Sequence, residues 1–216
     1  MLNYYYLVAF SYTIAIASVI GLVRYKKILA SYRLFVVFVT MAFVNEIISS
    51  VLVELIHNNA VNGNIYVLAE ATILFLLFYQ WGSFGNKMLG FLLTMIGAVW
   101  CAENLVFSSI THFNSFFRLF YSLAIVILSI DQINITMLHE RKNLFRNAKF
   151  IICCLFTFYY TFKATYEVFY FVPRQMSDTF YNNLFLILVF VNLFANLGYA
   201  IAALWIPTKQ KFTLPY

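Results

Sequence analysis

Seven long apolar stretches fill almost the whole of this chain, and only short polar segments separate them. An α-helix crosses a bilayer core with about 20 apolar residues, and by this measure the stretches are residues 3–23, 34–56, 63–81, 88–108, 114–137, 148–171 and 180–206. Only 10% of the residues are charged, against about 25% in soluble domains. The sequence therefore predicts an all-α, multi-pass membrane protein, with residues 1–216 forming a single bundle of seven transmembrane helices.

Basic residues occupy every second gap between these stretches. Eleven of the fourteen Lys and Arg residues lie near one set of span ends: Arg24, Lys26, Lys27, Arg33, Lys87, Arg141, Lys142, Arg146, Lys149, Lys209 and Lys211. Near the opposite ends are only Arg118 and Arg174. Because cytoplasmic loops carry the excess of positive charge, we expect the N-terminus outside and the C-terminus in the cytoplasm. This topology accounts for the positive net charge without a nucleic-acid partner, and the Phe-, Tyr-, Ile- and Asn-rich composition suggests a bacterial cytoplasmic membrane.

The predicted spans contain few residues that interrupt helices. None of the three prolines lies within a span, and the glycines inside spans are few: Gly21, Gly90, Gly97 and Gly198. We therefore expect continuous helices. Many secondary transporters form their binding sites from broken helices, so continuous helices favour a receptor.

Ionisable side chains at mid-membrane depth indicate a functional site, because burying them in a bilayer is costly. With a rise of 1.5 Å per residue, four such groups on four different helices lie roughly 18–22 Å above the cytoplasmic edge: Glu46, Glu70, Glu103 and Lys163. Three neighbouring residues complete the predicted ligand-binding site: Asn45, Asn104 and Tyr66. Three carboxylates and one ammonium leave negative charge, which a proton or a cationic ligand would balance.

Two further polar groups flank this layer. An outer rim consists of Glu54, Arg118 and Glu167, and an inner polar group consists of Asp131, Asn192 and Asn196. A purely structural role remains the alternative for all of these residues. Lys163 and Glu167 are one turn apart and can pair with each other, and buried polar groups also bond neighbouring helices together.

Several chemistries require motifs that the sequence lacks. The three histidines are too scattered for an intramembrane zinc site, and neither a GxSxG motif nor a phosphate-binding glycine loop is present. The chain is similar to microbial rhodopsins in length and helical topology alone, since residues 180–206 contain no lysine for a retinal Schiff base. We therefore expect no metal and no cofactor, and binding is favoured over catalysis.

Three functions are compatible with this pattern. The first is a small heptahelical receptor or sensor with an outward-facing polar pocket, which signals through a separate cytoplasmic partner. The second is a proton- or cation-coupled transporter or conductor that uses the same carboxylates. The third is an intramembrane enzyme acting on lipid. The expected partners are the lipid bilayer, a small cationic or polar ligand and a signalling protein.

Overall fold

The computed structural model describes residues 4–113, 115–139, 144–171 and 177–209. Within these ranges the chain forms helices and no strand, as expected for an all-α protein: α1 (Tyr4–Ser11), α2 (Ile14–Arg24), α3 (Arg33–Ile56), α4 (Ala60–Gln80), α5 (Asn86–Cys101), α6 (Ser115–His139), α7 (Ala148–Phe171) and α8 (Asp178–Trp205). A π-helical turn, Ala102–Phe107, extends α5. Four of the basic residues used for the topology prediction lie outside the described residues: Arg141, Lys142, Arg174 and Lys211.

Five helical segments of the described chain are long and apolar enough to cross a membrane: Ala30–Ile56, Ala60–Gln80, Asn86–Phe107, Ser115–His139 and Thr179–Trp205. The helix α7 has a similar length but is less apolar, because it carries Lys163, Glu167 and several tyrosines and threonines. Side chains on the periphery are apolar, for example Val23 at 76% and Ile127 at 67% exposure. Such a surface suits lipid rather than water, and it is consistent with an integral multi-pass membrane protein.

The helix ends are set by local residues. The helix α4 is followed by Gly82 at φ 81°, and the amide of Ser83 donates to the carbonyl of Phe78 at 3.1 Å. This left-handed C-terminal turn favours glycine, which has no Cβ to clash. At the N-terminus of α8, Ser177 caps the helix by accepting a hydrogen bond from the amide of Phe180 at 3.3 Å. The short turn at Gly82 lets α5 run back antiparallel to α4.

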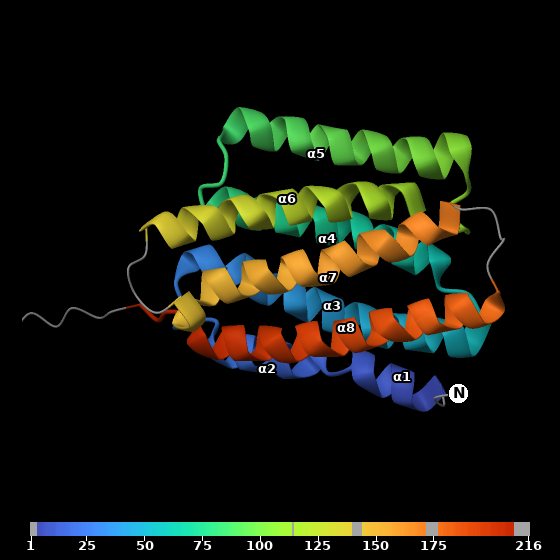
Figure 1. The fold of residues 1–216 in the computed structure, drawn as a ribbon, viewed down its shortest axis with the longest axis horizontal. Coiled ribbons are helices and arrows are strands. Elements are labelled where there is room, and N and C mark those ends of the chain that lie inside the picture. Colours follow the sequence, from blue (N-terminus) through green and yellow to red (C-terminus); the bar gives the residue numbers. More distant parts are fainter. Residues whose placement is uncertain (1–3, 114, 140–143, 172–176, 210–216) are drawn as a thin grey trace, which may run out of the picture.

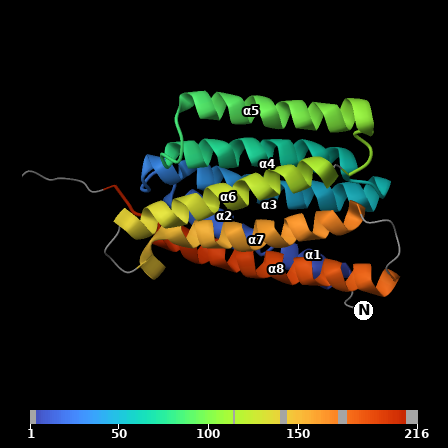
Figure 2. The same cartoon turned by 45° about the horizontal axis from the view of Figure 1, so that its top comes forward.

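The helices close into a ring that α5 does not enter. Neighbouring contacts run from α2 to α3, α4, α6, α7 and α8, and α8 packs back against α2. The helix α5 lies at the outer edge against α4, whereas α1 packs on α8 (Figures 1 and 2). Within the ring α7 and α8 approach closely, because a Cβ at Gly198 would lie only 2.6 Å from both Cδ atoms of Leu155.

The first predicted span is not a continuous helix, so the expectation of unbroken helices is wrong there. The helix α1 ends at Ser11 and α2 begins at Ile14. Between them the hydrogen bonds change spacing: the amide of Thr13 donates to the carbonyl of Phe10 at 3.3 Å, and the Thr13 hydroxyl donates to the same carbonyl at 2.6 Å. Neither proline nor glycine causes this break; the Thr13 hydroxyl and a side chain of α8, described below, stabilise it.

The C-terminal ends of α2 and α8 are joined at the place where the ring of helices closes. The Arg24 guanidinium donates to the carbonyls of Ala203 and Leu204 and, at 3.0 Å, to that of Ile206. Just beyond, Ile28 and Thr208 form an isolated antiparallel bridge. A cation at a helix C-terminus is favourable because the last carbonyls carry partial negative charge. Arg24 thus fixes the end of α8 against the end of α2.

Candidate functional site

Glu70 lies at the centre of the polar groups inside the bundle. Its side chain is buried, with the residue 3% exposed. The hydroxyl of Tyr121 donates to Oε2 at 2.5 Å, and that of Tyr160 donates to Oε1 at 2.8 Å. Tyr66, one turn earlier on α4, donates to Oε1 at 3.4 Å. Three helices therefore supply hydroxyl donors to one carboxylate.

Lys163 is the cationic partner of this carboxylate. Its ammonium lies 3.1 Å from Glu70 Oε2 and also donates to the Tyr121 hydroxyl. The rings of Tyr121, Tyr159 and Tyr160 lie 5.0, 5.6 and 5.4 Å from the ammonium, a range in which the face of an aromatic ring attracts a cation. The predicted meeting of Glu70 with Lys163 is therefore present, and tyrosines enclose it.

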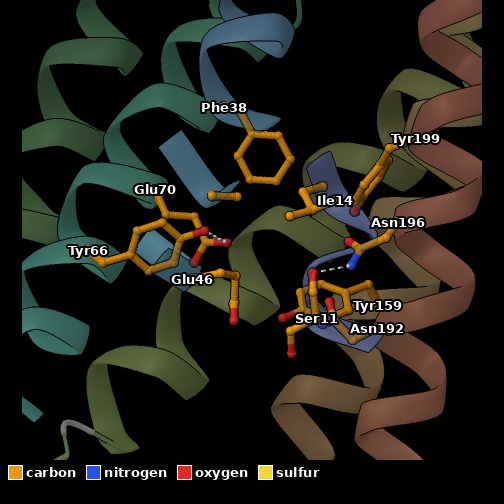
Figure 3. Close-up of a pocket in the computed structure, with 11 residues that line it drawn as sticks. Ser11, Ile14, Phe38, Glu46, Tyr66, Glu70, Tyr159, Asn192, Asn196 and Tyr199 are labelled. Carbon is orange, nitrogen blue, oxygen red and sulfur yellow. Dashed lines mark hydrogen bonds between the residues drawn. The ribbon is translucent and has the colours of Figure 1, made fainter. Parts of the chain in front are cut away.

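A small cavity adjoins this ion pair. It has a volume of about 80 Å³ and lies between the end of α1 and the helices α2, α3, α4, α7 and α8. Its polar wall is formed by Ser11, Glu46, Tyr66, Glu70, Tyr159, Asn192, Asn196 and Tyr199 (Figure 3). Glu46 is half-buried, and among the cavity-lining residues no Lys, Arg or His is present. The cavity is thus acidic.

The break in the first span forms one side of the cavity. The amide nitrogen of Asn196 donates to the carbonyl of Ser11 at 3.4 Å and to the hydroxyl of Thr13 at 3.2 Å, as drawn in part in Figure 3. Asn196 is 4% exposed. One turn away on α8, Asn192 also lines the cavity. These two residues, predicted as part of an inner group, therefore belong with Glu46 and Glu70.

A layer of aromatic rings closes the cavity toward the end of the bundle where α3 begins. We call Phe35, Phe38, Phe78, Phe156 and Tyr199 the aromatic layer; each is 0–3% exposed. Phe156 lies 5.6 Å from Phe38, 6.2 Å from Phe78 and 5.7 Å from Tyr199 between ring centroids. On α3, Phe38 precedes Glu46 by two turns, or about 12 Å. Rings from α3, α4, α7 and α8 therefore pack against one another on this side of the cavity.

Glu103 lies away from this cavity and contacts the start of α6. Its two carboxylate oxygens accept hydrogen bonds from the amides of Phe116, at 2.9 Å, and Phe117, at 2.7 Å. These amides belong to the first turn of α6, where the helix presents unpaired donors and partial positive charge. The preceding π-helical turn, in which the amide of Ser108 donates to the carbonyl of Glu103 at 2.8 Å, accompanies this contact. Glu103 therefore acts as the N-terminal cap of α6.

Asn45 and Asn104 also bond within the bundle rather than in the cavity. Asn45 accepts a hydrogen bond from Asn62 of α4 at 2.9 Å. The amide nitrogen of Asn104 donates to the carbonyl of Trp100 at 2.8 Å, and the indole of Trp100 donates to the carbonyl of Asn64 at 2.8 Å. Asn45 therefore links α3 to α4, whereas Asn104 bonds within its own helical segment and Trp100 makes the link to α4.

The outer-rim residues divide into a pair and a separate carboxylate. Arg118 lies 3.9 Å from Glu167 and 4.9 Å from the ring of Phe113. Glu167 is buried, whereas Glu54 is exposed at the end of α3. Lys163 and Glu167, although one turn apart on α7, each contact another helix instead of each other.

Asp131 does not join the other members of the predicted inner group. It is exposed on α6, whereas its neighbour Gln132 is buried and accepts a hydrogen bond from the Ser83 hydroxyl at 2.6 Å. A helix position one residue away faces about 100° around the axis, so adjacent polar residues can have opposite environments. Depth alone could not separate Asp131 from Gln132.

Ser11, Tyr121 and Tyr199 are among the residues of the site that sequence reasoning missed. Tyr121 follows Arg118 by one turn, which places it on the same face of α6. Tyr199 follows Asn192 and Asn196 on α8 at helical spacing. Those spacings are visible in the sequence, but the chain has sixteen tyrosines, and tyrosine is common at membrane interfaces. Spacing alone therefore did not identify these two as site residues. Ser11 had no marker, because nothing in its neighbourhood indicated the helix break.

The geometry permits binding more readily than catalysis. Both oxygens of Glu70 accept hydrogen bonds from tyrosine hydroxyls, and one of them also contacts the ammonium of Lys163, so the protein's own groups occupy this carboxyl group. Glu46 alone contributes a carboxylate to the cavity without a protein cation beside it there. No group of three or more His, Cys, Asp or Glu side chains suited to a metal ion occurs in the part of the chain that the structure describes.

Comparison with known proteins gives no relative. No protein-family model matches the sequence, and neither a curated protein nor a solved structure is similar enough to count as a match. The functional argument therefore depends on the site itself.

Proposed function

We propose that this protein is a seven-span receptor or sensor of a bacterial cytoplasmic membrane, with its N-terminus outside and its C-terminus in the cytoplasm. It binds a small polar ligand in the cavity beside Glu46 and signals through a separate cytoplasmic partner. In this proposal α1 and α2 together form the first span, and α7 crosses the membrane despite its charges, because Lys163 and Glu167 are paired inside the bundle. The alternation of basic residues supports the orientation.

The observation that carries the proposal is the position of the cavity on one side of the aromatic layer. With α3 starting in the cytoplasm, the polar cavity lies on the outer side and the packed rings lie on the inner side. A binding site that is closed toward the cytoplasm suits a receptor, whereas a transporter needs access from both sides in turn.

A connection from the cavity to the cytoplasmic face is provided by α8. This helix contributes Asn192, Asn196 and Tyr199 to the cavity wall, and its C-terminal carbonyls are held by Arg24. A ligand that binds two arrangements of α8 with different affinity shifts their populations. The proposed output is therefore a movement of the α2–α8 pair at the cytoplasmic surface.

Cysteine accessibility tests this proposal. Ser11→Cys places a thiol in the cavity, and a membrane-impermeant maleimide added to intact cells should label it, whereas the same reagent added to inverted vesicles should not. Ser177→Cys and Lys209→Cys are the controls, expected to react only from outside and only from the cytoplasmic side. Labelling of the parent chain, which retains Cys101, Cys153 and Cys154, is subtracted. Reaction of Ser11→Cys only from the cytoplasmic side would contradict the proposal.

A proton- or cation-coupled transporter is the second candidate, and the break between α1 and α2 favours it. Interrupted helices beside a mid-membrane polar site are common in transporters. Proteoliposomes containing the purified protein distinguish the two functions. A receptor gives no protein-dependent movement of protons, sodium or potassium down an imposed gradient. Flux that disappears in Glu46→Gln would identify a transporter instead.

An acid–base enzyme has less support from the geometry. Glycoside hydrolysis illustrates the usual need for two free carboxyl groups with different tasks. Here Glu70 is paired with Lys163, and Glu103 caps α6, which leaves Glu46 as the cavity-lining carboxylate without an ion-pair partner among the lining residues.

A further inference from the structure

The acidic cavity has features that define the chemistry of its ligand. We propose that it binds a small monovalent cation, either an alkali ion or a primary ammonium, with Glu46 as the counter-ion. This inference rests on the proposed function, because it specifies the class of ligand for the same cavity. The argument uses charge, oxygen donors and volume in turn.

Charge is the first part of the argument. Glu46 and Glu70 both line the cavity, and the ammonium of Lys163 lies 3.1 Å from Glu70. One carboxylate therefore remains in excess over the protein's own cations at this place. An uncompensated carboxylate in a low-dielectric interior is costly, and a bound cation removes that cost. A single excess charge matches a monovalent ligand rather than a divalent one.

Asn196 supplies a neutral oxygen to the cavity. The Thr13 hydroxyl donates its hydrogen to the carbonyl of Phe10, so it must accept from Asn196. The carbonyl of Ser11 is also an acceptor, and both bonds therefore fix the NH₂ group of Asn196 toward the helix break. The amide oxygen of Asn196 therefore points away from the helix break. Amide oxygens are good ligands for hard cations.

Tyr199 gives an independent indication that a ligand or water belongs here. Its side chain lines the cavity (Figure 3), and it is only 3% exposed. Its hydroxyl has no hydrogen-bond partner among the described residues. A buried hydroxyl without a partner costs free energy unless something in the adjoining space bonds to it. Its oxygen is a further neutral donor to a cation.

Volume restricts the size of the cation. One water occupies about 30 Å³ in the liquid, so a cavity of about 80 Å³ holds roughly two or three water-sized groups. Pockets for drug-sized ligands occupy about 300–1,000 Å³. The space is therefore sufficient for an alkali ion with one or two waters, or for ammonium or methylammonium, and it is too small for a large organic cation.

Protection of a cavity cysteine tests the inference. Ser11→Cys protein in right-side-out vesicles is alkylated in sodium, potassium, ammonium or methylammonium chloride, with N-methylglucamine chloride at the same ionic strength as the reference. A bound cation should slow alkylation about tenfold at ten times its dissociation constant, since only the empty fraction reacts. Protection by sodium or potassium assigns an alkali ion, and protection by the amines alone assigns an ammonium group.

Three variants in the Ser11→Cys background complete the experiment. Glu46→Gln should be alkylated at the same rate with and without cation, whereas Glu54→Gln, the same change at an exposed carboxylate, should remain protected. Tyr199→Phe keeps the ring and should raise the apparent dissociation constant roughly two- to tenfold. The thermal midpoint of each variant establishes that it is folded.

The possible failures separate the two proposals. Alkylation from outside that no cation slows, or that cations slow equally in Glu46→Gln, overturns the cation assignment and leaves the receptor proposal standing. Absence of alkylation from outside in the Ser11→Cys protein overturns the outward-facing cavity and, with it, the cation site.

Discussion

Glu70, Glu46 and Glu103 illustrate how one residue type performs different tasks at similar membrane depth. Glu70 is paired with Lys163 and three tyrosine hydroxyls, Glu103 caps a helix, and Glu46 faces a cavity. The rise per residue allowed their depth to be predicted from sequence, and it correctly brought Glu70 near Lys163. It could not predict that α5 lies outside the ring of helices, which separates Glu103 from the cavity.

Removing Lys163 should destabilise the bundle strongly. We expect Lys163→Met to lower the free energy of unfolding by about 3–5 kcal/mol, because it leaves Glu70 buried without its cation. Changing both residues, Lys163→Met with Glu70→Met, should recover most of this loss. Lys87→Met, at an exposed lysine, is the matched control and should have little effect. The measurement is denaturant-induced unfolding in detergent micelles; a double variant as unstable as the single one would contradict the pairing.

Removing Glu103 should affect stability without affecting the cavity. Glu103→Ala takes the acceptor away from the first amides of α6 and should cost about 0.5–2 kcal/mol of stability, the range measured for N-terminal caps. Glu54→Ala, at an exposed carboxylate, should cost much less. Cation protection of the cavity cysteine should be unchanged in both. Loss of cation protection in Glu103→Ala would show that Glu103 contributes to the ligand site after all.

At the scale of elements, the break between α1 and α2 is the feature that sequence reasoning could not supply. Breaks are usually predicted from proline or glycine, and this segment has neither near Thr13. The determinant is Asn196, which is distant in sequence and bonds to the interrupted backbone. The same limitation applies to α7, where one-turn spacing suggested a Lys163–Glu167 pair, but Lys163 pairs with Glu70 of α4 and Glu167 with Arg118 of α6.

The contact between α7 and α8 predicts opposite effects for one substitution at two glycines. Gly198→Ala should destabilise the protein by about 1–3 kcal/mol, because the added methyl group meets Leu155 and overpacks the interface. Gly97→Ala, on α5 where no atom lies within 4 Å of the added Cβ, should stabilise it by about 0.5–1 kcal/mol through helix propensity. Thermal midpoints of the two variants give the test. Equal shifts would show that α7 and α8 are not closely packed.

At the scale of the whole molecule, composition and the length of the apolar stretches predict the helices. The closure of the ring depends on contacts between helices that are distant in sequence. The sequence predicted an all-helical protein with spans near the observed helices. It did not predict that α5 lies outside the ring or that α8 returns to α2. Hydrophobicity predicts which segments are helices of this kind, but it does not predict which helices pack together, because every span is apolar on the side that faces lipid.

The Arg24 contact should contribute measurably to this closure. Arg24→Met removes donors to three carbonyls at the end of α8, and hydrogen bonds to a charged group contribute about 1.5–3 kcal/mol each at most. We expect an overall loss of about 2–4 kcal/mol in the free energy of unfolding. Lys26→Met, which removes the same charge from an exposed position nearby, is the control. Similar losses in both variants would indicate that net charge, rather than the contact, matters.

The return of α8 to α2 has a consequence for biogenesis. The ribosome delivers the helices in order, and α2 cannot acquire this neighbour until translation of α8 is complete. Until then its flank must be covered by lipid or by the insertion machinery. Nascent chains that stop before α8 should therefore be recognised as incomplete by membrane quality control, even though most of their helices have already been inserted.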